Sequence, residues 1–185
     1  MHFTLIKIDL EKPVSDGNLS DEQKIIFTVC HALNCVDKLD WVGYKECFVK
    51  GEVIYDYTSL NGGEPYRGDV DAFINLVVQT LPGYQATSHQ SANHEVSIEG
   101  ESAVFKSSII ATHYLPNKVT SSDFWQAIGF YEINLQKFAD VWKINQLKFI
   151  KTMVLGDCIG LRKLAKNLSD NKRHPRNFDS KIYTY

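Results

Sequence analysis

The chain has 185 residues, of which 44% are hydrophobic and 23% are charged, and this composition excludes a disordered or fibrous protein. The length suits one well-cored domain and is too short for two ordinary ones. Twenty Lys and Arg residues against 22 Asp and Glu residues give a formal net charge of −2. This balance provides no positive field for a polyphosphate, and the one dense basic cluster, residues 172–176, lies in a polar tail without aromatic residues. Nucleic acid is therefore not an expected partner.

The location of the protein is predicted from its N-terminus, its hydropathy and its cysteines. The first twenty residues include Asp9, Glu11 and Asp16 and no unbroken apolar stretch, so they do not resemble a secretory signal. No apolar run approaches the ~18 residues of a membrane span. The four cysteines show no CxxC pairing, which is typical of reduced thiols. We therefore expect a cytoplasmic protein that has no membrane partner.

Residues 1–19 are predicted to form an N-terminal arm, and the first helix starts directly after it. Ser20 and Gln23 form a capping box, in which each side chain bonds a free backbone N–H at the helix start. Apolar residues then recur at helical spacing as far as Val36, and Asp37 follows on the same face. Further patterns predict a helix from Asp40 to about Phe48, a strand over 52–59, a loop over 61–65 and a helix from Asp69 to about Leu81.

The second half of the chain is predicted to be mainly strand. Apolar alternation indicates four long strands joined largely by hairpins, over about residues 85–98, 102–115, 123–137 and 140–151. Apolar residues at helical spacing after Gly156 predict one amphipathic helix before a polar tail. We therefore expect an α+β fold, with helices against one face of a curved antiparallel sheet. The expected organisation is a domain over 20–151 followed by a C-terminal helix and tail over 152–185.

Two residues have side chains that do not suit their expected positions. Asp37 is a carboxylate at the end of a buried helix face, where burial is costly unless something pairs with it. The alternative is that the helix frays there and Asp37 lies in water, or that it caps the next helix. His113 shares the odd-numbered face of its strand with Phe105 and Ile109, which alternation marks as the inner face. A hydrogen-bonded core histidine is the alternative reading of His113.

Further residues would complete a pocket around Asp37 and His113. His89 starts the strand that forms a hairpin with the strand of His113, and Tyr57 shares a face with Tyr55. A histidine held by a carboxylate keeps one tautomer and gains basicity near the working pH, and a phenol can donate to a carbonyl as charge builds on it. Each of the aromatic residues could equally fill the core.

Metal binding and nucleophilic catalysis are less favoured uses of these residues. His89 and His94 are five residues apart, so in a regular strand they face opposite ways and could not share an ion without a bulge. Cys30 is on the predicted buried face of the first helix, where a thiol is usually an inert hydrophobe. The glycines at 62–68 lack the GK[ST] ending of a phosphate loop. We therefore expect no metal and no organic cofactor.

Several segments together resemble the SnoaL-like branch of the NTF2-like superfamily, with the pattern of scytalone dehydratase nearest. The order and spacing of these segments carry the resemblance over residues 20–151. The segments are Val36–Trp41, Ile54–Tyr57, Thr87–His89, His113, Gly129–Tyr131 and Val141–Lys143. The family implies a cone-like α+β fold in which a curved sheet and helices enclose a deep apolar pocket.

The resemblance also implies roles for particular residues. The dehydratase acts through residues that match Asp37, His89, His113 and Tyr57. Carried over, Asp37 and the histidines would move a proton from a carbon next to a carbonyl to a departing hydroxyl, and Tyr57 would polarise the carbonyl directly or through a water. Which imidazole pairs with Asp37 stays open. The predicted substrate-binding residues are Tyr55, Trp41, Tyr131 and Trp125.

Two departures from the dehydratase pattern argue against scytalone itself as the substrate. Val36 stands where the dehydratase has a tyrosine, and Tyr131 stands where it has an amide. We therefore hypothesise a cofactor-independent lyase or isomerase that acts on a small apolar or cyclic carbonyl or hydroxyl compound. The alternative is a non-catalytic pocket protein that binds a small ligand or serves as an assembly module. An epoxide-opening hydrolase also shares the superfamily, but its Asp–Arg–Asp arrangement is not found. The resemblance further implies a homodimer or homotrimer packed through the outer faces of its sheets.

Overall fold

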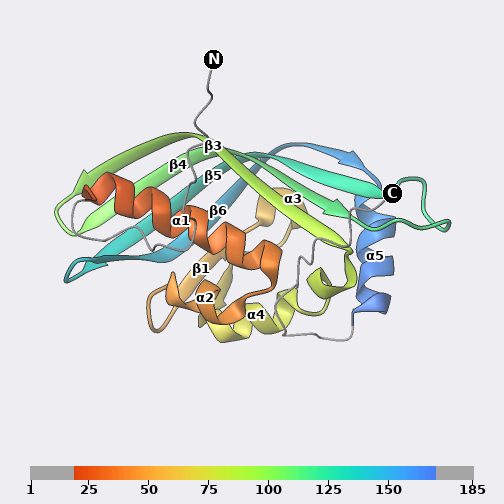
Figure 1. Cartoon of the computed structure of the whole chain (residues 1–185), viewed down its shortest axis with the longest axis horizontal. Helices are drawn as coiled ribbons and strands as arrows, with labels where there is room; N and C mark the ends of the chain where they lie inside the picture. The colour runs from red at the N-terminus through yellow and green to blue at the C-terminus, as the bar shows by residue number, and fades with distance from the viewer. Residues whose placement is uncertain (1–18, 170–185) are drawn as a thin grey trace, which may run out of the picture.

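The structure, a computed structural model, describes residues 19–169 and has helices packed against one face of a curved, open sheet (Figure 1). The elements in chain order are α1 (Asp21–Lys38), α2 (Trp41–Glu46), β1 (Val53–Asp56), α3 (Thr58–Asn61), β2 (Tyr66–Gly68), α4 (Val70–Val77), the short 3₁₀ helix η2 (Leu81–Gly83), β3 (Ala86–Glu99), β4 (Ser102–Tyr114), β5 (Phe124–Phe138), β6 (Val141–Gly156) and α5 (Cys158–Leu168). The predicted α+β class is confirmed. Residues 1–18 of the predicted arm and residues 170–185 of the predicted tail lie outside the described residues.

The sheet has the strand order β2-β1-β6-β5-β4-β3. Strands β3 to β6 are the four predicted strands, and each pairs antiparallel with the next along the chain. The short strands differ from the prediction. β1 pairs parallel with β6, and β2, which lies just after the predicted loop 61–65, pairs antiparallel with β1. β6 also runs to Gly156, five residues past the predicted end at 151.

The predicted strand over 52–59 is wrong in its second half, because the chain turns after Asp56. The Asp56 carboxylate accepts hydrogen bonds from the backbone N–H of Thr58 at 3.1 Å and from its hydroxyl at 2.6 Å. Such a local side-chain turn competes with strand pairing and starts the single turn of α3. The hydroxyl of Ser59 then donates to the carbonyl of Phe149 at 2.6 Å and fixes α3 to β6. Tyr57 therefore lies at a helix start rather than within a strand.

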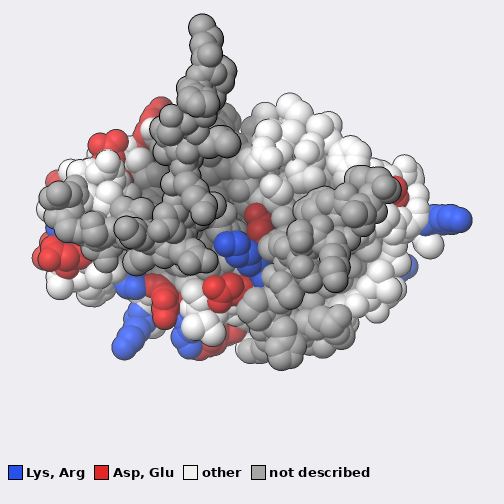
Figure 2. Space-filling model, in the orientation of Figure 1, with Lys and Arg blue, Asp and Glu red and all other residues white. Residues whose placement is uncertain are grey.

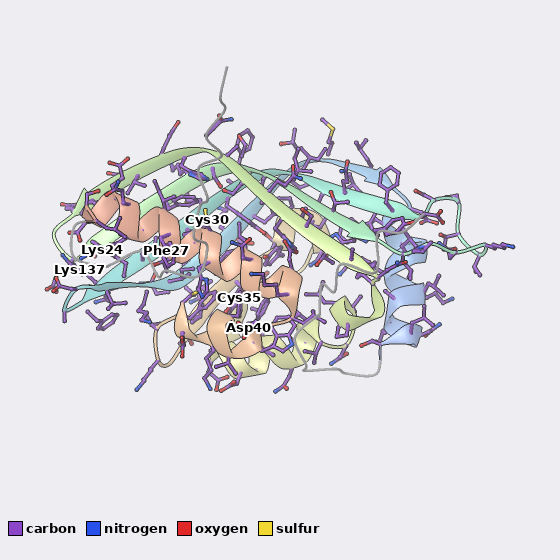
Figure 3. The ribbon with its side chains drawn as sticks, viewed as in Figure 1. Lys24, Phe27, Cys30, Cys35, Asp40 and Lys137 are labelled. Atoms are coloured by element: carbon purple, nitrogen blue, oxygen red, sulfur yellow. The ribbon has the colours of Figure 1, made fainter. Side chains whose placement is uncertain are left out.

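The long helix α1 lies across the sheet and begins as predicted. The Ser20 hydroxyl accepts from the Gln23 backbone N–H at 3.2 Å, and the Gln23 amide oxygen accepts from the Ser20 N–H at 2.9 Å. Apolar residues on one face of α1, above all Ile25 and Val29, are almost fully buried. Figure 3 shows Lys137 beside the first turn of α1, where it forms an ion pair with Asp21 at 2.8 Å. The helix ends at Leu39, which adopts the left-handed conformation.

A tight junction joins α1 to α2. Asp40 caps α2 by accepting from the backbone N–H of Gly43 at 3.0 Å, and Cys35 lies next to it (Figure 3). A Cβ at Gly43 would lie 2.7 Å from the Asp40 carboxylate and 2.9 Å from the Cys35 sulfur, so a larger residue here would displace the capping carboxylate. The cap of the second helix is therefore Asp40, which leaves Asp37 for another contact.

The inner face of the sheet carries the core. The alternation predicted for β4 is confirmed, since its buried residues are Ala103, Phe105, Ser107, Ile109, Ala111 and His113. The surface carries charges of both signs, which are interspersed on the face shown in Figure 2. Within residues 19–169, no helix is long and apolar enough to cross a membrane.

Helix α5, predicted after Gly156, closes the end of the molecule opposite the start of α1 (Figure 1). Asp157 caps it by accepting from the Gly160 N–H at 2.8 Å, and Leu161 and Ala165 are fully buried. A Cβ at Gly83 in η2 would lie 1.9 Å from the carbonyl oxygen of Ala165. The backbones of α5 and η2 therefore touch directly at Gly83.

Candidate functional site

The helices and the inner sheet face enclose a cavity of about 370 Å³. Its walls are mostly apolar, as is typical of a small-molecule site. Of the eight residues predicted for a site, seven line this cavity, namely Trp41, Tyr55, Tyr57, His89, His113, Trp125 and Tyr131. The eighth, Asp37, lies behind His89. The residues that the sequence singled out are thus brought together by the fold, while their roles stay predictions.

Two hydrogen bonds join Asp37 to His89. The Oδ1 atom of Asp37 lies 2.7 Å from the ring Nδ1 of His89, and its Oδ2 accepts from the His89 backbone N–H at 2.8 Å. Both side chains are largely buried, with 16% of Asp37 and 11% of His89 exposed. The alternative of a frayed helix end is therefore wrong, and the imidazole that pairs with Asp37 is that of His89.

The fold brings this pair together by packing the C-terminal end of α1 against the start of β3. His89 and the buried Thr87 share the inner face of β3 by two-residue alternation. Burial alone would raise the pKa of Asp37, but hydrogen bonds from the ring and backbone of His89 and from Thr87 outweigh it and hold that pKa below its usual value. Asp37 is therefore a carboxylate, which accepts hydrogen bonds and donates none.

The carboxylate fixes the tautomer of His89. Because Asp37 accepts, Nδ1 of His89 donates the hydrogen bond, and in the neutral ring the lone pair is on the other nitrogen, Nε2. His89 also lines the cavity, so the nitrogen that faces away from Asp37 is the one available to a bound molecule. This arrangement suits a general base whose ring is oriented by an adjacent carboxylate.

The second imidazole, His113, has a different environment. Its ring stacks on Trp125 with centroids 4.0 Å apart and an interplanar angle of 5°, and it contacts the edges of Tyr84 and His89 at 5.1 and 5.7 Å. Tyr84 accepts a hydrogen bond from the Trp125 indole at 2.9 Å, which holds this aromatic group together. Burial, with the charge that His89 carries when it is protonated as a second cause, lowers the pKa of His113 well below its usual value. His113 is therefore neutral near pH 7.

The low pKa of His113 has a consequence for stability. An unfolded chain binds a proton at this histidine below about pH 6.5, whereas the folded protein does not. The contribution of His113 to the free energy of unfolding is thus fully present above that pH. As the pH falls toward the folded pKa, this contribution is lost by up to about 1.4 kcal/mol per pH unit. We expect His113→Gln to reduce this slope in urea unfolding measured between pH 7.5 and 5. An identical slope in the variant would contradict this assignment.

Tyr57 and Tyr131 both line the cavity, and their hydroxyl groups lie next to each other. Their hydroxyl oxygens lie 3.5 Å apart, and either can be the donor. Burial raises the pKa of Tyr57 and raises the pKa of Tyr131 well above its usual value. Both phenols therefore keep their protons and can donate hydrogen bonds to an oxygen in the cavity. Tyr57 reaches this place from the start of α3, although it was predicted to reach it from a strand.

Tyr55 and Trp41 belong to a group of aromatic rings in the lining of the cavity. The ring of Tyr55 stacks on Phe73 with centroids 3.6 Å apart, and Trp41 contacts the edge of Tyr44 at 6.1 Å. Tyr55 is only 1% exposed, and its hydroxyl interacts with that of Tyr44. The indole N–H of Trp41 is buried and has no hydrogen-bond partner among the described residues. These two side chains shape the apolar part of the cavity.

Neither metal binding nor a reactive thiol gains support from the described residues. A bulge after Ala92, with Asn93 at a φ of 55°, turns His94 onto the inner face, so His94 and His89 do share a face. Nevertheless, residues 19–169 contain no group of three His, Cys, Asp or Glu side chains that could hold an ion. Burial raises the pKa of Cys47 to about 12, so this thiol stays protonated.

The site residues that were not predicted from the sequence include four that make polar contacts. Thr87 hydrogen-bonds to Asp37, and its place two residues before His89 on the same face was a usable signal. Tyr84 supports Trp125 from a turn, where no periodicity marks an inner face. Asn61 and Arg162 line the cavity from α3 and α5. Their positions depend on how these two helices dock, which local patterns do not contain.

A family comparison agrees with this fold and cavity. Residues 17–148 match the SnoaL-like domain, which covers well over half of the chain. The chain belongs to the SnoaL-like family. The match ends before α5, so that helix lies outside the matched region of this SnoaL-like protein. No curated protein matches the chain.

Solved structures share the fold of this SnoaL-like domain at low sequence identity. The protein Kfla4162 from Kribbella flavida is similar with a TM-score of 0.68 and 21% identity, over 79% of this chain and 97% of that one. A protein provisionally assigned as a scytalone dehydratase, from Novosphingobium aromaticivorans DSM 12444, gives 0.61 and 18% over 74% and 87%. Hexachlorocyclohexane dehydrochlorinase LinA-type3 from Novosphingobium barchaimii LL02 gives 0.59 and 13% over 74% and 89%. These likenesses confirm the predicted NTF2-like fold.

Proposed function

We propose that this SnoaL-like protein is a cofactor-independent lyase or isomerase that uses general acid–base catalysis on a small, partly apolar, cyclic carbonyl or hydroxyl compound. The observation that supports this most strongly is the Asp37–His89 pair at the wall of an apolar cavity. An acid–base group in such a place is costly to bury and has no structural need to face a cavity.

The proposed reaction is the loss of water from a β-hydroxy carbonyl compound. Nε2 of His89 takes a proton from the carbon next to the carbonyl, and the Asp37 carboxylate stabilises the resulting imidazolium. A hydroxyl of Tyr57 or Tyr131 donates to the carbonyl oxygen as negative charge builds on it. The carbon–oxygen bond to the β-hydroxyl then breaks, and the imidazolium returns its proton to the departing hydroxyl. One substrate molecule thus gives one unsaturated carbonyl compound and one water.

The role proposed for His113 is narrower. Because its pKa is held well below the usual value, His113 is neutral and can offer a hydrogen bond without acting as an imidazolium acid. Its ring lies 5.7 Å from that of His89, so it can orient the same substrate or a water beside it. Proton transfer is thus assigned to His89 and positioning to His113.

The names of two structural neighbours support elimination as the reaction class. One is provisionally assigned as a dehydratase and another is named a dehydrochlorinase, and both names describe the loss of a small molecule from adjacent carbons. Because the identities are 18% and 13%, the likeness itself shows only the fold. The geometry around His89 carries the proposal independently of these names.

The proposal can be tested with a bicyclic probe of suitable size. In 3-hydroxy-1-tetralone, loss of water gives the fluorescent aromatic product 1-naphthol, so turnover is seen directly as a fluorescence gain. We expect catalysed release of 1-naphthol above the spontaneous rate with this compound or with monocyclic β-hydroxy ketones. If these compounds bind, as measured by calorimetry, but none turns over, the non-catalytic ligand-binding alternative is the better account.

We also propose that the protein assembles as a homodimer or homotrimer through the outer face of the sheet. Large apolar side chains gather there on the last three strands, and each is more than a third exposed, namely Ile110, Tyr114, Phe124, Phe130, Ile150, Met153 and Leu155. An apolar surface of this extent on a sheet is typical of an interface. A second copy of the chain would cover it with an identical surface.

Phe130→Glu tests this assembly, because Phe130 lies within this surface and is 51% exposed. Light scattering should report a dimer or trimer for the wild type and a monomer for the variant. Val42→Glu, on α2 and 74% exposed, is the matched control and should keep the wild-type mass. A wild type that is monomeric at all concentrations would contradict the proposal.

A further inference from the structure

Arg162 is the only Lys or Arg among the described residues that line the cavity. It comes from α5, which lies outside the stretch that matches the SnoaL-like domain. The other charged or titratable polar residues of the lining, apart from tyrosines, are His89, His113 and the exposed Glu64. A mostly apolar cavity thus has one permanent positive charge in its lining, on the exposed Arg162.

The docking of α5 places this charge at the edge of the cavity, where Arg162 and Asn61 are both exposed. Leu161 and Ala165 flank Arg162 in the helix and are fully buried, and Ala165 touches Gly83 backbone to backbone. The guanidinium Nη1 donates to the Oδ1 atom of Asn61, the last residue of α3, at 2.9 Å. Arg162 therefore bridges α5 and α3, two helices that are separated by about a hundred residues of sequence.

The partner of Arg162 is neutral, so its charge is not cancelled there. Among residues 19–169, no carboxylate lies within 4.0 Å of the guanidinium, and Glu64 forms no ion pair with it. An arginine has five N–H donors, of which the bond to Asn61 uses one. Because the Oδ1 atom of Asn61 accepts from Arg162, the amide N–H₂ of Asn61 is a further donor at the same place.

The charge also acts on the interior of the cavity. The positive charge of Arg162 is one of the smaller causes, after burial and His89, that hold the pKa of His113 low. It also opposes the burial that raises the pKa of Tyr84 to about 12. Arg162 is therefore close enough to the aromatic group around His113 to interact electrostatically with a molecule bound there.

We propose that the ligand of this cavity is a carboxylic acid, whose carboxylate is bound by Arg162 and Asn61 while its apolar body lies against the aromatic walls. A planar guanidinium matches the two oxygens of a carboxylate, and charge-assisted hydrogen bonds of this kind are strong. With the carboxylate held between α3 and α5, the rest of a small cyclic molecule extends toward His113 and His89. This rests on the proposed function and narrows its substrate class to cyclic hydroxy or keto acids.

The test compares two probes that differ in charge but hardly in shape, 2-naphthoate and 2-naphthamide, by titration calorimetry at about pH 7.5. The wild type should bind the carboxylate at least about 10-fold more tightly than the amide. Arg162→Gln should weaken carboxylate binding by about 10–100-fold and change amide binding less than about twofold. Arg67→Gln is the matched control, because Arg67 is exposed, pairs with Glu52 and does not line the cavity, and it should bind both probes like the wild type.

Three results would overturn the inference. They are equal affinity of the wild type for the two probes, no detectable binding of 2-naphthoate, and an unchanged preference in Arg162→Gln. Binding is measured without turnover, so the outcome is separate from that of the proposed function. A carboxylate preference that disappears with Arg162 in a protein without dehydratase activity would support the ligand class and reject the enzyme. Dehydration of neutral hydroxy ketones with no carboxylate preference would support the enzyme and reject the ligand class.

Discussion

Replacing Asp37 by asparagine should lower the rate of dehydration by about 10²–10⁴-fold. Asparagine has nearly the same shape as aspartate, but it carries no charge to stabilise an imidazolium. Its amide can also present an N–H₂ group to Nδ1 of His89, which would favour the tautomer with the proton on Nε2. The ring nitrogen that faces the cavity would then have no lone pair with which to take a proton.

This prediction is checked by the release of 1-naphthol from 3-hydroxy-1-tetralone, with kcat and KM measured separately. Most of the loss should fall on kcat, since Asp37 acts through His89 and does not line the cavity. Asp71→Asn is the matched control, because Asp71 is exposed and pairs with Lys45 on the surface, and it should keep full activity. Full activity in Asp37→Asn would show that the pair with His89 is only structural.

Replacing Phe105 by alanine should lower the free energy of unfolding by about 3–5 kcal/mol. Phe105 is fully buried on the inner face of β4, where its ring contacts that of His94 at 5.2 Å. Removing the ring loses its transfer free energy and leaves a cavity in the core that close-packed neighbours fill only partly. Phe105 does not line the ligand cavity, so its loss affects the core rather than the site.

Urea unfolding measures this effect, and Phe27→Ala provides the matched control. Phe27 is 58% exposed on α1 and stacks on His31, so its removal should cost less than about 1 kcal/mol. The folded fraction of Phe105→Ala should keep kcat within a few-fold of the wild type, the opposite of the pattern expected for Asp37→Asn. A cost below about 1 kcal/mol for Phe105→Ala would contradict its place in the core.

Features of the fold that depend on neighbours in sequence were predictable. The inner face of β4 follows from two-residue alternation, and this places His113 correctly. The start of α1 follows from the capping box of Ser20 and Gln23. The α5 helix follows from its amphipathic spacing. In each case the physical cause acts within a few residues, so the pattern is visible in the sequence.

Features that depend on distant contacts were not predictable from such patterns. The parallel pairing of β1 with β6 joins segments about ninety residues apart. The turn at Asp56 ends β1 although the following residues fit a strand pattern. The resemblance to the SnoaL-like family indicated Asp37 and His89 together, but their bond depends on how α1 lies on β3. The bond from Arg162 to Asn61 depends on the docking of α5 in the same way.

The central claim is that the Asp37–His89 pair moves a proton between a ligand and the enzyme, and isotope exchange measures this step alone. The protein is incubated with 1-tetralone in D₂O, and the loss of the proton signal at the carbon next to the carbonyl is followed by NMR. Exchange catalysed by the wild type and reduced by about 10²-fold or more in Asp37→Asn and His89→Gln is the predicted result. Binding of 1-tetralone without catalysed exchange, or equal exchange in all three proteins, would contradict it.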